Sequence, residues 1–414
     1  MKMFSAKTIL KLVFISLIPP FLLIIPFWRG WSHFYYLDLV KQSGIFNLFS
    51  NWDGPHYILI ARSLYDQQIL GARLFMQLPI EYYFNHFPLY PILIRLLSTV
   101  AGWGWSGIFV NLFFSTISNF VFFFWVRRKT AHPFWLTLTF TLLPPRMYPI
   151  RAIIAPEFLM LALMMLCLIF ANRKKYFLAG IFGMLATLTK FQAIVLVPAL
   201  ILAFLHQQMF PNQSFIELIQ KLFSLTKLKL NYLVRGLIKS TKLILSSTEF
   251  KYVVGCGILI FSGYLIVTTF YFSKTGSWWT YFASQKVNNL TAGLPFAQFD
   301  YHSPWSGTGW MEELVFYFLM MILLIQRYAQ KKVNQIYFYF ICFYSLMLVL
   351  VPQRDITRLS LPLVPFFMLT FERFFSSKTF RLALVLIFPA LYMYSLNFLM
   401  HNQAPVADWS LILF

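Results

Sequence analysis

Cysteine and acidic residues are both scarce in this sequence of 414 residues. The chain has 13 Asp and Glu against 34 Lys and Arg, and its three cysteines lie in apolar runs without paired spacing. Disulfide frameworks and cysteine metal sites need spaced pairs, so we expect these cysteines to be packing residues. The sequence also lacks an Asp-x-Asp motif and a glycine-rich phosphate loop. A nucleotide site that holds a divalent metal is therefore not indicated, and no cofactor is expected.

Charged residues of either sign are only 11% of the chain, whereas hydrophobic residues are 59%. Apolar runs of roughly 16 to 25 residues recur from end to end, without the alternation that strands of a membrane barrel need. The sequence therefore predicts an all-α polytopic membrane protein with about eleven transmembrane helices. We place the spans at about 9–27, 104–126, 133–149, 157–171, 176–190, 192–206, 252–272, 312–326, 334–351, 359–373 and 382–400.

The positive charge is distributed unevenly along these spans. If the N-terminus is cytoplasmic, the cytoplasmic ends carry 22 of the 34 basic residues and three of the 13 acidic residues. Basic residues collect on the cytoplasmic side of membrane proteins, so the charge is interpreted as an orientation signal and a contact with membrane lipids. No nucleic-acid partner is expected. The predicted location is the cell membrane, or the endoplasmic reticulum membrane in a eukaryote, with the active site on the extracytoplasmic side.

Three segments of the predicted single domain, residues 1–414, are too polar to cross the membrane. Segment 28–103 is broken by Pro and Gly but keeps helical apolar spacing at 55–65 and 88–100, which predicts a large extracytoplasmic loop with two interfacial helices. Segment 207–250 is predicted to be a cytoplasmic amphipathic helix. Segment 273–311 is an extracytoplasmic aromatic loop, either an ordinary interfacial belt or a lid that grips sugar or lipid.

The run from Asn51 to Tyr57 is the most informative stretch, because it puts Asp53 and His56 just beyond the first span. Ionisable residues at a lipid boundary are costly, and they indicate a functional site. Asp53 precedes Gly54-Pro55, so it is either the N-cap of the first interfacial helix or a general base that takes a proton from an attacking hydroxyl. Trp52 is either a substrate contact or an anchor at the headgroups.

Other unusual polar residues also fall on the predicted outer face, where they share one cavity only if the spans form a bundle. Each has a structural alternative. A histidine is often a satisfied interface residue, a glutamate can complement a helix dipole, and a basic residue can snorkel or form an Arg–Asp pair with Asp355. These residues are His86, Glu157, Lys190, Gln192, His302, Arg354 and Arg358.

Several motifs resemble one family. Trp52-Asp53-x-x-His56-Tyr57, followed by His86-Phe87-Pro88-Leu89-Tyr90-Pro91, resembles the GPI mannosyltransferase II-like family of GT-C glycosyltransferases, in particular its bacterial members. The resemblance covers roughly residues 5–375. It continues more weakly through Pro156-Glu157-Phe158-Leu159, through Leu188-Thr189-Lys190-Phe191-Gln192 and through Arg358 to Pro365.

This resemblance implies a GT-C-like helix bundle and an inverting transferase. The donor would be a polyprenyl-phosphate sugar, with mannose expected, and the acceptor an extracytoplasmic glycan, glycolipid or protein. Asp53 would be the base, with His56 and Glu157 as further catalytic residues. Arg354, Arg358 and Lys190 would bind the donor phosphate, and Trp52, His86, Gln192 and His302 would bind substrate. Ala155-Pro156 and Lys190-Phe191 depart from the family's Tyr-Ser/Thr and Arg-Pro, and these departures concern the acceptor or phosphate side of the implied site.

Two other classes of function stay open at this point. A transporter or lipid flippase also carries a charged cavity among many spans, although its polar residues gather near the middle of the membrane rather than at one face. An accessory subunit of a glycosylation complex would use the outer loops to bind a partner. Activity of the purified chain alone separates these alternatives from the transferase.

Overall fold

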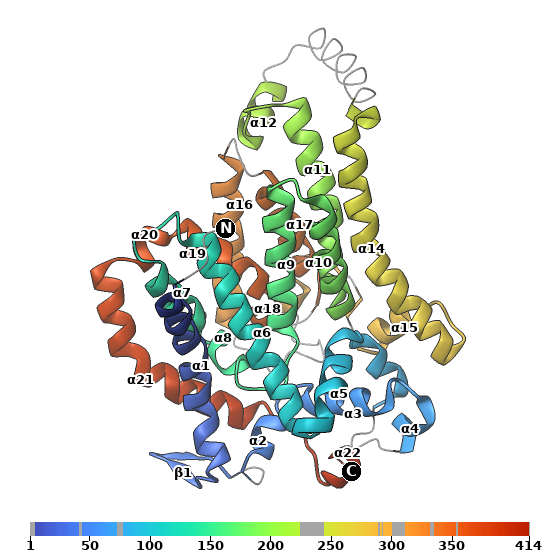
Figure 1. The fold of residues 1–414 in the computed structure, drawn as a ribbon, viewed down its shortest axis with the longest axis vertical. Helices are drawn as coiled ribbons and strands as arrows, with labels where there is room; N and C mark the ends of the chain where they lie inside the picture. Colours follow the sequence, from blue (N-terminus) through green and yellow to red (C-terminus); the bar gives the residue numbers. More distant parts are fainter. Residues whose placement is uncertain are drawn as a thin grey trace. The chain divides into compact units, whose positions relative to one another are not determined.

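The computed structural model describes residues 5–40, 44–72, 78–223, 244–288, 290–291, 293–299, 311–331, 335–352 and 355–413. In these ranges most of the chain is helical (Figure 1). The only strands in these ranges are β1 (His33–Phe34) and β2 (Leu37–Asp38), which pair antiparallel with His33 opposite Asp38. The prediction of an all-α protein is therefore confirmed for the part of the chain that the structure describes.

Five helical segments are long and apolar enough to cross a membrane, which supports the predicted membrane protein. They are α1 (Ala6–Trp28), α6 (Trp103–Val126), the segment Phe191–Met209, α14 (Thr248–Thr275) and α21 (Lys378–His401). Shorter apolar helices lie at five of the six remaining predicted spans, and the span predicted at 312–326 corresponds to α16 (Met311–Ala329). The full set of eleven crossings stays a prediction.

Prolines interrupt two of the predicted spans. The span expected at 133–149 begins as α7 (Pro133–Leu142), ends before Pro144 and Pro145, and resumes as the single turn α8 (Met147–Ile150). The span expected at 359–373 is divided into α18 (Ile356–Leu359), the 3-10 turn η4 (Leu361–Leu363) and α19 (Val364–Thr370). Proline has no backbone N–H and clashes with the preceding turn, so neither segment forms one continuous helix.

The chain divides into two compact units. The first contains residues 1–165, 267–291 and 371–414. In it, α1 packs against α6, α7 and α21, as Figure 1 also shows. The first predicted loop also belongs to it, and its two expected helical stretches are helices α3 and α5. The elements of this loop are α2 (Phe46–Phe49), α3 (Gly54–Ser63), α4 (Gln67–Ala72), η1 (Ile80–Asn85) and α5 (Leu89–Ala101).

The second unit contains residues 166–266 and 292–370. Here α11 (Leu196–Met209) packs along α17 (Gln335–Leu350), which also contacts α16 (Met311–Ala329). Helices α9 (Glu157–Asn172) and α14 each contribute residues to both units, and α10 (Tyr176–Thr189) belongs to the second.

The predicted amphipathic segment 207–250 is described only in part. It includes α12 (Phe215–Phe223), which opens with a capping box, because Glu217 accepts from the Ser214 N–H while Ser214 Oγ accepts from the Glu217 N–H. Residues 224–243 of that prediction lie outside the described residues.

Candidate active site

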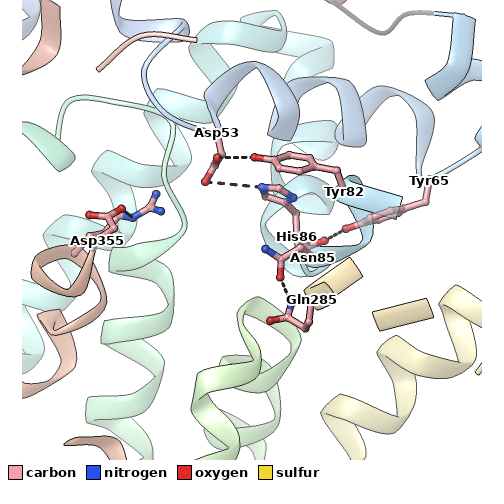
Figure 2. A network of polar contacts seen from close by, with 8 residues as sticks. Asp53, Tyr65, Tyr82, Asn85, His86, Gln285 and Asp355 are labelled. Carbon is pink, nitrogen blue, oxygen red and sulfur yellow. Dashed lines mark hydrogen bonds and ion pairs between the residues drawn. The ribbon is translucent and has the colours of Figure 1, made fainter. Parts of the chain in front are cut away.

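Asp53 occupies the N-cap position of α3, but its side chain makes no capping hydrogen bond. The carboxylate is directed instead toward Tyr82 of η1 and toward His86, which follows η1 (Figure 2). The Tyr82 hydroxyl donates to Asp53 Oδ1 over 3.4 Å, and His86 Nε2 lies 3.8 Å from Asp53 Oδ2. With 26% of its side chain exposed, Asp53 keeps access to solvent. The arrangement is that of an oriented, accessible carboxylate rather than a helix cap.

His86 is held in place through its backbone. Its carbonyl oxygen accepts hydrogen bonds from two phenols, the Tyr65 hydroxyl and the Tyr271 hydroxyl, the latter at 3.0 Å. Tyr57 packs edge-on against the imidazole, with ring centroids 4.9 Å apart. Only 5% of the histidine is exposed. A buried ring fixed in this way can hold the Asp53 carboxylate in one orientation.

His56 lies one turn into α3, 3% exposed, among the rings of Tyr82, Tyr83 and His86. Burial lowers the pKa of His56 to about 3; the nearby Asp53 carboxylate raises this pKa and His86 lowers it, both by less than the burial effect. The imidazole is therefore neutral at physiological pH. A ring whose pKa is this low is a poor proton acceptor, which argues against His56 as a general base.

The pKa of His56 gives a prediction for the pH dependence of stability. An unfolded histidine titrates near pH 6.5, whereas the folded one stays neutral to about pH 3, so the unfolded state gains a proton first as the pH falls. The contribution of His56 to the free energy of unfolding is therefore constant above about pH 6.5. Below that pH the free energy of unfolding falls by up to about 1.4 kcal/mol per pH unit. We expect the unfolding temperature in detergent to fall less between pH 7 and pH 4.5 for His56→Gln than for the wild-type chain. Parallel curves for the two proteins would contradict the buried neutral imidazole.

The segment that leads into Asp53 is fixed by residues near the other end of the sequence. Trp52 has a positive φ of 48°; its N–H donates to the Asn402 carbonyl at 2.9 Å, and its ring packs edge-on against Phe398. The Asn51 side chain donates to the Leu399 carbonyl at 2.9 Å, and the Ala404 N–H donates to the carbonyl of Ser50 at 2.7 Å. Sequence analysis missed this support, because it runs through backbone carbonyls that no side-chain pattern marks.

Gly54 is required sterically at the start of α3. A Cβ atom built at this position would lie 2.3 Å from the backbone oxygen of Phe49. Real Cβ atoms do not approach a carbonyl oxygen so closely, so a larger residue would have to displace the backbone next to Asp53. The glycine therefore contributes to the placement of the carboxylate.

The aromatic motif that begins at His86 has its own structural role through Tyr90. The Tyr90 hydroxyl donates to the Gly107 carbonyl and accepts from the Ala155 N–H, both at 2.9 Å. It thereby joins α5, α6 and the turn before α9. Glu157, the first residue of α9, is 2% exposed and interacts electrostatically with Tyr90. The structure thus places Glu157 in the same unit as Asp53, but buried beside a phenol.

A second buried ion in this unit is Arg151, which is 0% exposed. Its guanidinium donates to Ser115 Oγ at 2.5 Å and to the carbonyls of Phe140 and Thr141 at 3.1 and 3.0 Å. It also lies over the Phe158 ring, 4.2 Å from the centroid. These contacts satisfy a cation that would be costly to bury alone, and they join α6, α7 and α9.

Two of the three residues predicted to bind the donor phosphate, Lys190 and Arg358, are described, and both belong to the second unit. Arg358 Nε lies 2.6 Å from Asp355 Oδ2, and the two side chains are 11% and 18% exposed. This is the predicted Arg–Asp pair, but it is largely buried rather than at the surface. Lys190 links α10 to η2 (Phe191–Val195), which contains Gln192, and both side chains are half-buried. Arg354 and His302 lie outside the described residues.

The predicted site is thus brought together in part. Asp53, His56 and His86 form one cluster of the first unit, with Trp52 directly before it in the chain. It stays a prediction that this cluster forms one site together with Lys190, Gln192 and Arg358. Among the described residues no group of three His, Cys, Asp or Glu side chains is arranged to hold a metal ion. The sequence matches no protein-family model, and no curated protein matches it.

Proposed function

We propose that this chain is an inverting membrane glycosyltransferase that moves a sugar, with mannose expected, from a polyprenyl phosphate to an extracytoplasmic acceptor. The observation that supports the proposal best is the orientation of Asp53. Its carboxylate occupies a helix N-cap position without capping the helix, contacts Tyr82 and His86, and stays accessible. Such a group is suited to accept a proton from a hydroxyl that reaches it from outside the protein.

In the proposed reaction, an acceptor hydroxyl donates a hydrogen bond to Asp53 and attacks the anomeric carbon of the donor. A new glycosidic bond forms as the bond from that carbon to the phosphate oxygen breaks. The electron pair of the broken bond leaves with the phosphate, and the hydroxyl proton passes to Asp53. A single displacement of this kind inverts the anomeric centre and needs one base, whereas retention needs a second nucleophile. Tyr82 and His86 keep the carboxylate oriented.

The departing phosphate gains negative charge, so a fixed cation would stabilise the transition state more than the ground state. We propose Arg358 for this role. Asp355 Oδ2 lies 2.6 Å from its Nε, and this close ion pair fixes the position of the guanidinium. A largely buried pair of this kind also positions the arginine more firmly than a surface pair would.

Variants of the Arg358–Asp355 pair test this role. Arg358→Ala is expected to lower kcat/KM for the lipid-linked donor about tenfold to a hundredfold, mainly through kcat, because a hydrogen bond between charged groups contributes roughly 1.5–3 kcal/mol. Arg358→Lys keeps the charge but loses the planar fork, so an intermediate kcat/KM is expected. Asp355→Asn is the matched control, since it keeps an acceptor for Nε and leaves the cation in place. Equal losses in Arg358→Ala and Asp355→Asn would indicate a purely structural pair.

The proposed function as a whole is tested by transfer with the purified chain in proteoliposomes. The assay supplies polyprenyl-phosphate mannose and a panel of soluble glycan, glycolipid and peptide acceptors, and it measures labelled product and free polyprenyl phosphate. We expect both products to appear in equal amounts from this chain alone. Movement of the intact donor across the bilayer without cleavage would support the flippase. Transfer that appears only with a second subunit would support the accessory role.

A further inference from the structure

Helix α15 (Thr280–Val287) buries small polar side chains, together with Tyr281, and exposes aromatic side chains on its other side. The side chains of Thr280, Ser284 and Asn288, at its start, middle and end, are buried. The side chains that face outward include Trp279 and Phe282, which are 70% and 49% exposed. In water the apolar face of a helix is the one that turns inward. A helix that buries polar groups and exposes aromatic rings therefore indicates apolar surroundings on its outer side.

The buried polar groups of α15 are satisfied within the protein. Thr280 Oγ1 donates to the Ser277 carbonyl, Ser284 Oγ donates to the Tyr281 carbonyl and Asn288 Nδ2 donates to the Ser284 carbonyl, each at 2.7 Å. These local bonds remove the cost of burying the polar groups. The buried polar side chains on the inward face of α15 therefore have hydrogen-bond acceptors within the protein. The side chains on the outward face are exposed.

Three outward rings are exposed in this region, and we name them the aromatic face, defined as Trp278, Trp279 and Phe282. Trp278 stacks on Phe272 in the last turn of α14, with centroids 4.4 Å apart, and Trp279 contacts Phe282 at 5.7 Å. The aromatic face therefore continues the exposed apolar surface of α14 across the bend at Gly276. Lys286 lies on the exposed side of the same helix.

The neighbouring helix identifies the occupant of this surface. Helix α14 has 28 residues and meets the criteria for a membrane span. At 1.5 Å per residue it is about 42 Å long, which exceeds a hydrocarbon core of about 30 Å, so its end at Thr275 falls near the headgroups. Trp278 follows only three residues later. Tryptophan rings with a nearby lysine are the side chains that settle at the boundary between headgroups and acyl chains.

We infer that α15 is a membrane-contact helix whose aromatic face lies in the lipid headgroup–acyl boundary at the C-terminal end of α14. Its opposite face contacts the residues on either side of His86. Gln285 donates to Asn85 of η1 (Figure 2), and Tyr281 packs on Phe87 with ring centroids 5.2 Å apart. Asn85 directly precedes His86. The helix therefore connects the bilayer surface to the element that holds His86, and this assignment does not depend on the proposed reaction.

Spin labelling in lipid vesicles tests the inference. A nitroxide is attached at Phe282→Cys, or at Val287→Cys on the same side, in a chain whose Cys167, Cys256 and Cys342 are replaced by alanine. The vesicles contain phosphatidylethanolamine and phosphatidylglycerol. The measured quantity is the ratio of collisions with oxygen to collisions with a water-soluble nickel complex. We expect this ratio to be several-fold higher at these positions than at the matched control Gln68→Cys, an exposed site on α4.

Two results would overturn the membrane contact. Collision ratios at positions 282 and 287 equal to that at Gln68→Cys would show that the face is in water. An immobilised label that is shielded from both reagents, in detergent as well as in vesicles, would show that a protein surface covers it instead. The expected result in detergent alone is a mobile label, because the lipid boundary is then replaced by a fluid micelle.

Discussion

Asp53→Asn is expected to lower the turnover of sugar transfer by about a hundredfold or more while leaving donor binding almost unchanged. Asparagine has the size of aspartate and accepts the hydrogen bond from Tyr82, but it cannot take the proton of the attacking hydroxyl. The measurement compares kcat and the KM for the donor in proteoliposomes at saturating acceptor. The effect should appear in kcat, because proton transfer belongs to the chemical step.

The same variant distinguishes the base from a helix cap. Asparagine caps a helix as well as aspartate does, so a purely structural Asp53 would tolerate the change in both activity and thermal stability. Tyr82→Phe is the matched control, since it removes one contact to the carboxylate without removing the carboxylate. We expect it to lower kcat about tenfold or less. Normal turnover by Asp53→Asn would remove the catalytic assignment.

Gly54→Ala should have the second large effect. Because the new Cβ would lie 2.3 Å from the Phe49 backbone oxygen, α3 must shift at the residue that follows Asp53. Overpacking of this kind costs about 1–3 kcal/mol of stability, and a displacement of about 1 Å at a catalytic group can cost about a hundredfold in rate. We expect both a lower unfolding temperature and a loss of turnover of at least about tenfold.

Gly255→Ala provides the matched control for that substitution. Gly255 lies inside α14, and a Cβ atom built there meets nothing within 4 Å. Alanine is the better helix former, so this variant should be as stable as the wild-type chain or slightly more stable, with unchanged transfer. If Gly54→Ala and Gly255→Ala behaved alike, the steric requirement at the start of α3 would be wrong.

Periodicity predicted the helices well because apolar spacing is a local property. The expected helical stretches 55–65 and 88–100 correspond to α3 and α5, whose bounds are Gly54–Ser63 and Leu89–Ala101. The same reasoning gave too long a helix at 133–149, where the Pro144–Pro145 pair ends regular structure although the apolar character continues. Hydropathy alone does not register the missing backbone donors.

The support around Asp53 could not be predicted from the sequence. The contacts of Asn51 and Trp52 with Leu399 and Asn402 join residues about 350 positions apart through backbone carbonyls, which leave no side-chain pattern. The same holds for Tyr271, whose hydroxyl reaches the carbonyl of His86 from α14. The neutral state of His56 likewise depends on burial among rings, and its position after Asp53 gave no indication of it.

The position of a bound donor relative to Asp53 is the most direct test of the proposed transferase. The measurement is an experimental structure of the Asp53→Asn variant with polyprenyl-phosphate mannose. A base lies about 2.6–3.2 Å from the hydroxyl it deprotonates, and the reacting atoms lie about 3–3.5 Å apart, so the anomeric carbon should be within about 6 Å of residue 53. The phosphate should leave on the far side of that carbon. A donor bound with its anomeric carbon more than about 12 Å away, twice the span of one bridging hydroxyl, would contradict the role of Asp53 as the base.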